Sequence, residues 1–497
     1  MKQYVTFAVA LFGISAIQAQ DISDAIRYSQ ENLNGTARFR AMSGAFGALG
    51  GDFSAINVNP AGSAVFSTSQ VGMTLSSLNR KNESNYFGTI TDSKENSIDL
   101  GQGGAVFVFK NDNMDSKWKK VALAVNYENT NNLRNSLFSA GTNPGNSIVD
   151  YFVSYANQGG VTLNTLESSY YENLNYGDAQ AFLGYQAYLI NPVTNDLNNS
   201  QYSSNVLAGG NYYQENAVAT TGFNGKLNFN IATSYDNKYY FGLNLNSHFT
   251  DFRQSASVYE SNNNGGSNGV SKLRFNNELY TYGSGFSFQL GGIAKVTDGL
   301  RLGLAYDSPT WYSLNDEISQ AVSSRHFIDE VETSTTVNPR ITVAYDVYKL
   351  QTPGKWTGSA AYVLGTTSLI SVDYSIKDYS ATTFKPKNEF TGVNNAMSEL
   401  LDNSSEIRIG AEHRIKQLSL RAGYRMEQSP YKNKNLMGDL TGYSAGLGYD
   451  FGGTKVDVAY NYFERDSKQA FLNQGFTDGA TISSVNNNVS LSLIFEL

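Results

Sequence analysis

Asn488-Val489-Ser490-Leu491-Ser492-Leu493-Ile494-Phe495-Glu496-Leu497 closes the chain with side chains that alternate in character. The apolar residues Val489, Leu491, Leu493, Phe495 and Leu497 share one face, and Asn488, Ser490 and Ser492 share the other. A period of two is typical of a β-strand with one apolar and one polar face. Such strands meet in the core of a soluble sandwich, or face lipid around a transmembrane barrel.

The N-terminal residues favour the membrane alternative, because they have the features of an export signal. Lys2 precedes an apolar run over residues 4–17, and Ala19 stands at the expected cleavage point. We therefore predict a signal peptide over residues 1–19, although the sequence does not fix the exact cleavage site. A buried N-terminal helix is the alternative. No later run reaches the roughly 18 apolar residues of a spanning helix, so any membrane crossing requires strands.

The composition supports an exported barrel. The 497 residues include no cysteine, which excludes a disulfide framework, a thiolate metal site and a lipoprotein anchor. The 33 Tyr and 28 Phe suit the aromatic girdles of membrane barrels. The net charge of −8 gives no basic surface for nucleic acid, so we expect no nucleic-acid partner.

Sets of alternating apolar residues recur from residue 67 to the C-terminus, and we count 14 of them. The stretch 340–348 is counted with 355–364 as one long strand, because single-chain bacterial barrels have even strand numbers. Pro353-Gly354 then requires a bulge or an exposed position. The predicted fold is all-β: a 14-stranded antiparallel transmembrane β-barrel with an N-terminal hatch that plugs the lumen.

The predicted connections alternate between short and long, which is the outer-membrane pattern. Asp298-Gly299 and Gly452-Gly453 are tight turns, whereas 80–97 and 379–404 are read as long polar links. The longest link, 129–221, is unusually apolar and partly helical in its spacing. It is either a lid that packs on itself, or a surface that binds an apolar ligand or a protein partner.

The segment between the leader and the first strand is predicted to be the hatch. Residues 21–32 read as a short helix that Asp21 caps, with Asp24 at the third helical position. The following Gly- and Ala-rich run carries four large apolar residues, which either line a path for an apolar ligand or anchor the plug to the wall: Phe39, Met42, Phe46 and Phe53. The predicted divisions are a signal peptide at 1–19, a hatch at 20–66 and a barrel at 67–497, with the long outer loop at 129–221.

Asn59-Pro60-Ala61-Gly62 follows the Gly/Ala-rich run 35–52 and directly precedes the first strand. With this order, and with Leu369-Ile370-Ser371-Val372-Asp373-Tyr374 in a middle strand, the chain resembles the long-chain fatty-acid and aromatic-hydrocarbon transporters of the outer membrane (the FadL/TodX type). The resemblance implies a Gram-negative outer membrane and passive uptake of hydrophobic small molecules, such as long-chain fatty acids or aromatic hydrocarbons. It also implies a sideways exit through a gap in the wall, which the sequence does not locate.

The chain departs from the family pattern in two places. It does not end in the usual aromatic residue, since Phe495 stands two places before the end. The large apolar loop follows the third predicted strand, whereas the ligand-capturing helices of the family are usually in later loops. We therefore assign no ligand-binding site in a loop of this chain from the resemblance.

Two neighbouring strands carry charges on the phase that faces the lumen: Arg408, Glu412 and Arg414 on the first, and Arg421 and Arg425 on the second. They form either a ladder of salt bridges that stiffens the wall, or a site for a ligand carboxylate, which arginine binds with two hydrogen bonds.

Nothing in the sequence points to catalysis. The three histidines, His248, His326 and His413, are far apart, and no metal-ligand spacing occurs. We expect no enzyme activity, metal or cofactor, and a monomer whose partners are outer-membrane lipid and a hydrophobic ligand. The alternatives are a barrel of the same family that serves as a platform for surface protein secretion, a haem or lipid receptor, and a porin, which would need an open lumen.

Overall fold

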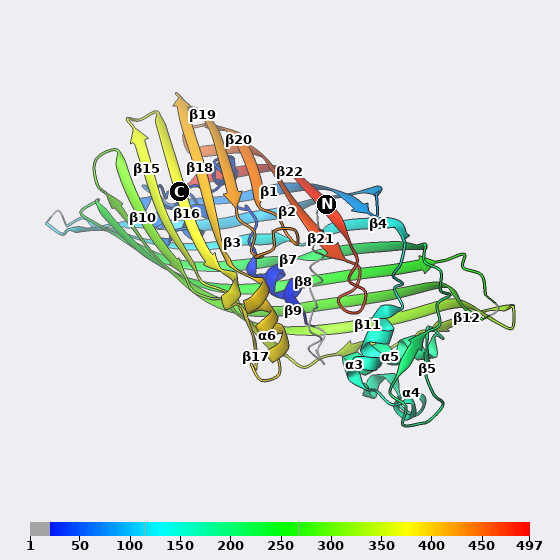
Figure 1. Cartoon of the computed structure of the whole chain (residues 1–497). Helices are drawn as coiled ribbons and strands as arrows, with labels where there is room; N and C mark the ends of the chain where they lie inside the picture. The colour runs from blue at the N-terminus through cyan, green and yellow to red at the C-terminus, as the bar shows by residue number, and fades with distance from the viewer. Residues whose placement is uncertain (1–19, 114, 267) are drawn as a thin grey trace, which may run out of the picture.

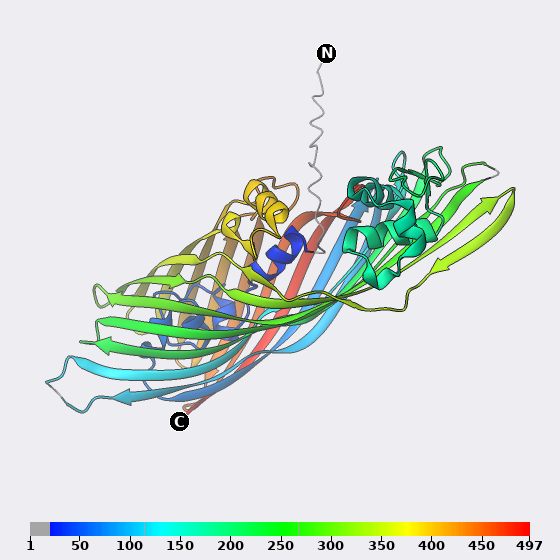
Figure 2. The same ribbon diagram turned by 90° about the horizontal axis from the view of Figure 1, so that it is seen from below.

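The computed structural model describes residues 20–113, 115–266 and 268–497, so the predicted signal peptide lies outside the described residues. Its strands form one closed antiparallel barrel (Figures 1 and 2). Strand β1 (Gln70–Tyr86) pairs with β2 (Thr89–Lys110) on one side and with β22 (Gly479–Glu496) on the other, which closes the sheet. The predicted 14-stranded barrel is confirmed.

Several positions in the wall are built from more than one segment, because the strand there is interrupted. After β1 and β2 the wall consists of β3 (Trp118–Asn132) with β4 (Asn135–Asn143), β7 (Tyr212–Tyr235), β8 (Tyr239–Ser261), β9 (Gly269–Lys295), β10 (Leu300–Asp307) with β11 (Trp311–Ile328), β12 (Val331–Val337) with β13 (Val343–Ala344), β14 (Tyr348–Gln351) and β15 (Lys355–Leu364), β16 (Ser368–Asp378) with β17 (Thr383–Lys385), β18 (Asn403–Ile415), β19 (Leu418–Glu427), β20 (Leu440–Asp450), β21 (Thr454–Ala470) and β22.

The segments β12 to β15 occupy one position in the wall, so the predicted joining of 340–348 with 355–364 is correct, and β12 extends the same strand. β13 and β14 pair with β11, β15 pairs with β10, and both β10 and β11 pair with β9. Pro353 lies in the break between β14 and β15, and Pro309 lies in the facing break between β10 and β11. Proline cannot donate to the ladder, so both strands are interrupted at the same height. Thr352 N still donates to Thr310 O at 3.0 Å.

The alternation at the C-terminus separates lipid from lumen. Val489, Leu491 and Phe495 are exposed on the outer face of β22, whereas Ser490 and Ser492 are buried inside the barrel. An apolar belt over polar lumen residues is the pattern of a transmembrane barrel. Among the residues that the structure describes, no helix is both long and apolar enough to cross a bilayer.

One expected loop is instead strand, and a second is shorter than expected. The link expected at 80–97 is wrong, because β1 and β2 continue to a tight turn at Phe87-Gly88, where both residues have positive φ. The loop expected at 129–221 is shorter, because the end of β3, all of β4 and the start of β7 leave only residues 144–211 as the connection. Beyond the apolar belt both faces of a strand meet polar surroundings, so the hydrophobic alternation ends while the backbone ladder continues.

Residues 144–211, here called the outer cap, fold into helices at the end of the barrel opposite the C-terminus (Figure 2). The elements are α3 (Asp150–Gly159), α4 (Leu163–Ser168), η3 (Tyr171–Asn173), α5 (Tyr176–Gln186), β5 (Ile190–Pro192) and β6 (Tyr202–Ser204). Phe152 of α3 packs against Phe275 of β9, with ring centroids 5.4 Å apart. Buried Glu260 accepts hydrogen bonds from Ser147 Oγ at 2.6 Å and from Ile148 N at 2.7 Å. The cap thus packs on itself and on the inner wall, which favours the lid interpretation.

We expect Phe152→Ala to loosen the outer cap without opening the barrel. Truncating a fully buried phenylalanine typically costs about 3–5 kcal/mol of unfolding free energy. Limited proteolysis should then cut residues 144–211 faster, while the barrel keeps its heat-modifiable mobility on gels. The matched control is Tyr170→Ala, since Tyr170 lies in the same segment with its side chain 72% exposed. Equal cleavage of both variants would contradict the packing described here.

Candidate functional site

Residues 20–66, here called the hatch, lie inside the barrel and are built from short helical elements (Figures 1 and 2). These are α1 (Ile22–Ser29), α2 (Ala37–Ala41), η1 (Ser54–Asn57) and η2 (Pro60–Val65). The capping of α1 agrees with the sequence prediction: Asp21 accepts from Ser23 N at 2.7 Å, and Asp24 accepts from Asp21 N at 3.0 Å. The helix ends at Ser29, a little before the predicted end.

The hatch lies directly on glycines of the inner wall. A Cβ atom at Gly291 of β9 would lie 2.1 Å from Asn59 Oδ1, and one at Gly242 of β8 would lie 2.3 Å from the carbonyl carbon of Pro60. The same close approach occurs at Gly303 on β10, Gly410 on β18, Gly423 on β19 and Gly446 on β20. Because these wall residues have no side chain, the hatch packs closely against the wall at several strands of the barrel.

The Asn-Pro-Ala-Gly motif ties the hatch to the wall and to itself. Asn59 Nδ2 donates to Gly47 O at 2.8 Å and to Gly292 O at 3.0 Å, and Asn59 Oδ1 accepts from Ala61 N at 3.1 Å. One buried amide therefore joins two parts of the hatch and strand β9. Both N–H groups and the oxygen of the amide are used here, which explains why an asparagine suits this place.

The next residues of the motif fix the turn into η2. Pro60 is the first residue of η2, and its carbonyl accepts from Asn230 Nδ2 of β7 at 3.0 Å. Gly62 O accepts from Gly51 N at 3.0 Å. Proline at the first helical position loses no hydrogen bond, since that N–H has no helical acceptor. The motif is thus a docking element of the hatch.

Asp373 of β16 is a second docking residue, and the sequence analysis did not assign it a role. Its Oδ2 accepts from Phe46 N at 2.9 Å and from Gly47 N at 3.0 Å. Asp373 lies in the stretch 369–374, at a position whose side chain faces the lumen. A lone carboxylate facing the lumen was the feature of the sequence that could have indicated this contact. A carboxylate held by two backbone N–H groups fixes the hatch turn to the wall.

The four large apolar residues of the hatch are enclosed. Phe39, Met42 and Phe46 belong to one buried cluster, in which the rings of Phe39 and Phe46 lie 5.5 Å apart. Phe53 packs against Phe66 at 5.6 Å in a separate cluster that includes wall residues of β2, β3 and β22. This arrangement favours the anchoring interpretation over an open apolar path.

The predicted lumen charges fall into two groups, and the first surrounds Glu412. This buried carboxylate pairs with Arg414 at 2.7 Å, with Arg421 at 2.6 Å and with Arg38 of the hatch at 2.9 Å. Arg421 also pairs with Asp457. Two of these arginines belong to the wall and one to the hatch, so the group links the plug to strands β18 and β19.

The second group surrounds Glu406, nearer the outer cap. Arg408 pairs with Glu406 at 2.8 Å, and Arg425 pairs with both Glu406 and Glu427. Arg408, Arg414, Arg421 and Arg425 therefore all have carboxylate partners from the protein. This favours the salt-bridge ladder over a free site for a ligand carboxylate at these residues.

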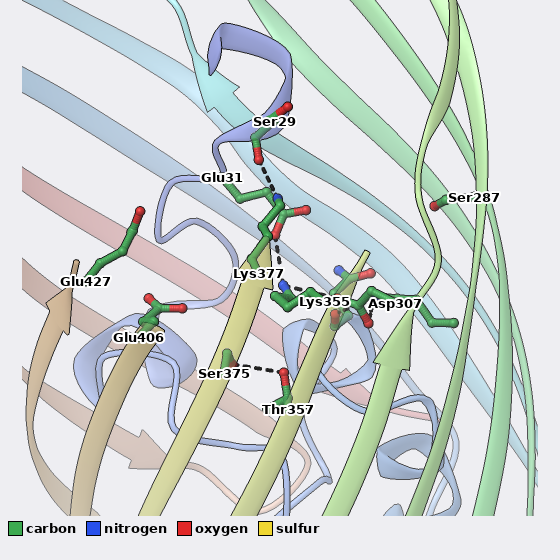
Figure 3. A network of polar contacts seen from close by, with 12 residues as sticks. Ser29, Glu31, Ser287, Asp307, Lys355, Thr357, Ser375, Lys377, Glu406 and Glu427 are labelled. Atoms are coloured by element: carbon green, nitrogen blue, oxygen red, sulfur yellow. Dashed lines mark hydrogen bonds and ion pairs between the residues drawn. The ribbon is translucent and has the colours of Figure 1, made fainter. Parts of the chain in front are cut away.

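Two wall lysines that the sequence analysis did not single out hold the end of the hatch helix (Figure 3). Lys355 of β15 pairs with Glu31 of the hatch at 3.1 Å and with Asp307 of β10 at 3.1 Å. Lys377 of β16 donates to the carbonyl oxygen of Ser29. These contacts are polar, and the side chains of Lys355 and Glu31 are partly exposed.

The backbone pairing of the wall is interrupted between β2 on one side and β3 with β4 on the other. The β2–β3 ladder reaches only to Gln102 and Glu128, and beyond it side chains replace the backbone pairs. Asn132 Nδ2 donates to Ser97 Oγ at 2.8 Å, and Ser93 Oγ donates to the carbonyl of Ser136 on β4 at 2.7 Å. A cavity of about 30 Å³ lies beside the end of the ladder and touches the hatch.

At the end of the barrel where the C-terminus lies, the space between the hatch and the rim is lined by polar side chains. Pockets of about 270 and 440 Å³ open there, and both are lined by Arg38, Gly51, Val65 and Arg414. Among the described ranges, no group of three or more His, Cys, Asp or Glu side chains is placed to hold a metal ion.

Comparison with known proteins gives one family. Residues 184–492 match the model of the family described as outer membrane protein transport protein (OMPP1/FadL/TodX). The fold is similar to that of a FadL homologue from Pseudomonas aeruginosa, with a TM-score of 0.55, 13% identity, and 94% of this chain and 99% of that chain covered. The toluene transporter TodX from P. putida gives a TM-score of 0.53 with the same identity and coverage. No curated protein matches by sequence.

We expect Gly291→Val to displace the hatch from the wall, because its side chain would occupy the position of the Asn59 amide. Overpacking of this kind costs about 1–3 kcal/mol of unfolding free energy. Urea unfolding should show the loss, and liposomes holding the variant should become permeable to a small sugar. Gly358→Val is the control, since a Cβ there meets no atom within 4 Å. An equally tight barrel in both variants would show that the hatch does not depend on this contact.

Proposed function

Because the chain belongs to the family of outer-membrane transport proteins of the FadL and TodX types, we propose that it admits hydrophobic small molecules passively across the outer membrane of a Gram-negative bacterium. Long-chain fatty acids and aromatic hydrocarbons are the ligand classes to test. The observation that carries the proposal is a lumen filled by a hatch that only non-covalent contacts hold.

The hatch contacts suit an opening that needs no energy source. Asn59, Asp373, Glu412 and Lys355 each fasten the hatch to the wall through hydrogen bonds or ion pairs. A single hydrogen bond contributes about 0.5–3 kcal/mol net, and removing one partner of a buried ion pair such as that of Glu412 costs about 3–5 kcal/mol. A ligand that binds the displaced hatch more tightly than the docked hatch would shift this equilibrium.

The polarity of the lumen supports a sideways exit. The pockets below the hatch are lined by charged groups such as Arg38, Arg414 and Lys455, which an apolar molecule would have to desolvate. The interruption beyond Gln102 and Glu128 instead lies next to Leu100 and Tyr127 on the face of the apolar belt. We propose this interruption as the exit into the bilayer.

The other functions fit less well. A secretion platform would present apolar surface outward, whereas the outer cap buries most of its apolar side chains. A porin would need an open lumen. No observation favours a haem receptor or an enzyme. We propose a monomer, because closure of the sheet satisfies the strand edges within the apolar belt.

The function is tested by uptake into liposomes of a fluorescent long-chain fatty acid and a small hydrophilic sugar, with the intact protein and with a variant lacking residues 21–66. The intact protein should pass the fatty acid and exclude the sugar, and the deletion should pass the sugar. A correctly inserted intact barrel that passes neither solute would refute the proposal.

The exit is tested by bridging the interruption. The chain has no cysteine, so Ser97→Cys and Asn132→Cys create one defined pair that a short thiol-reactive crosslinker can join. We expect crosslinking to lower fatty-acid uptake at least about tenfold, because the exit then opens only with strain. The control pair is Asn79→Cys and Asn96→Cys, which face each other in the intact β1–β2 ladder. Unchanged uptake through a fully crosslinked Ser97–Asn132 pair would place the exit elsewhere.

A further inference from the structure

Two lysines lie side by side on the outer face of the wall, where β14 pairs with β17. Lys349 of β14 stands directly opposite Lys385 of β17 in the ladder. Their neighbours along the two strands, Leu350 and Phe384, are buried in an apolar cluster that includes Ile26 of the hatch. Successive residues of a strand point to opposite faces, so both lysines point away from the lumen. Like charges in directly opposite positions destabilise a sheet, which makes a nearby counter-charge favourable.

The hydrogen-bond partner of this pair is neutral. Lys385 Nζ donates to Gln351 Oε1 at 2.7 Å. Within residues 20–113, 115–266 and 268–497, no carboxylate lies within ion-pair distance of Lys349 or Lys385. Lys355, on the lumen side of the neighbouring strand, instead pairs with two carboxylates. The two outward lysines are therefore available to an anion from outside the chain.

The apolar belt just below the two lysines sets their depth in the membrane. On the outward face it runs from Leu302 of β10 to Trp311 of β11, which are both exposed. Nine residue steps of about 3.3 Å at a tilt of about 40° give a height of about 23 Å, close to the roughly 25 Å of a membrane belt. Trp311 stands opposite Gln351, and Ser313, the next outward residue of β11, stands opposite Lys349. The lysines thus lie one step beyond the belt, at the level of the lipid headgroups on the side of the outer cap.

Aromatic rings mark the same boundary on both sides of the break in the wall. The ring of Trp311 lies 6.5 Å from that of Phe286, and the ring of Trp356 lies 4.6 Å from that of Tyr306. The two tryptophans are 41% and 56% exposed on the outer face. Aromatic girdles of this kind stand at the interfaces of membrane barrels, which supports the depth assigned to the lysines.

We propose that Lys349 and Lys385 bind the phosphate group of a phosphorylated lipid in the outer leaflet. A phosphate between the two ammonium groups supplies their counter-charge and accepts hydrogen bonds from both, and the hydroxyl of Ser313 stands beside them as a further donor. The acyl chains of this lipid lie along Trp311 and Phe286. The net charge of the chain is −8, so a general attraction of anionic lipid to the protein is not expected, and the preference is local.

The bound lipid joins two parts of the wall that few other contacts hold. β17 is only three residues long and pairs with β14. It leads into α6 (Thr391–Leu400), whose Met397 packs in the same inner cluster as Ile26 of the hatch. A phosphate that bridges Lys349 and Lys385 ties these two strands together a second time, from the outside. This role is separate from the passage of a ligand through the lumen.

The test measures how strongly lipids with brominated acyl chains quench the tryptophan fluorescence of the full chain in phosphatidylcholine vesicles. The chain has three tryptophans, and Trp118→Phe is introduced throughout so that the signal comes from Trp311 and Trp356 beside the site. Brominated phosphatidic acid, whose headgroup is a phosphate monoester, is compared with brominated phosphatidylcholine at the same mole fraction. The ratio of the two quenching curves gives the relative affinity for the phosphate headgroup.

The variants are Lys349→Gln, Lys385→Gln and the two together. Lys272→Gln is the matched control, because Lys272 is also exposed but stands opposite Arg325 near the outer tip of β11, far above the headgroups. Heat-modifiable gel mobility checks that each barrel is folded.

We expect the protein with both lysines to prefer phosphatidic acid by about tenfold or more, since each basic residue near a membrane surface contributes about fivefold. Each single variant should lower this preference about fivefold, and the double variant should bring it to within about twofold of unity. Lys272→Gln should leave it unchanged. Equal quenching by the two lipids when both lysines are present, or a preference that survives in the double variant, would overturn the proposal.

Discussion

The closed ladder of backbone hydrogen bonds is the constraint on which the rest of the structure depends. A chain that crosses a bilayer with strands must leave no unpaired edge in the hydrocarbon, so β22 returns to β1. Closure at 14 strands leaves a lumen that the side chains of the wall do not fill. The hatch and the outer cap follow from this geometry, because each fills one section of a tube that would otherwise pass water.

The hatch meets the wall in two physically different ways. At glycines such as Gly242 and Gly303, backbone lies against backbone, and the fit depends on the absence of side chains. At Asp373 and Glu412, single buried carboxylates bind the hatch through directed polar contacts. The first kind of contact determines the shape of the plug. The second kind determines where the plug sits along the wall. Neither kind involves a covalent bond.

The sequence predicted the elements that the membrane constrains, because strands that cross a bilayer must alternate apolar and polar residues. The strand count, the joining of 340–348 with 355–364 and the cap of α1 at Asp21 all follow from alternation, parity or local capping. The expected link at 80–97 failed because β1 and β2 extend into water, where both faces are polar. The docking role of Asp373 also escaped prediction, because it depends on contacts between segments far apart in the chain.

The outer cap has a consequence for the order of assembly. Its helices lie early in the chain, but their apolar core is completed by Phe476 and Ile482 from the final hairpin and by Tyr86 from the first. The cap core therefore cannot be finished until the last strands are synthesised and the sheet has closed. Before that moment the helical segment carries uncovered apolar surface, which makes the unfinished chain prone to aggregate.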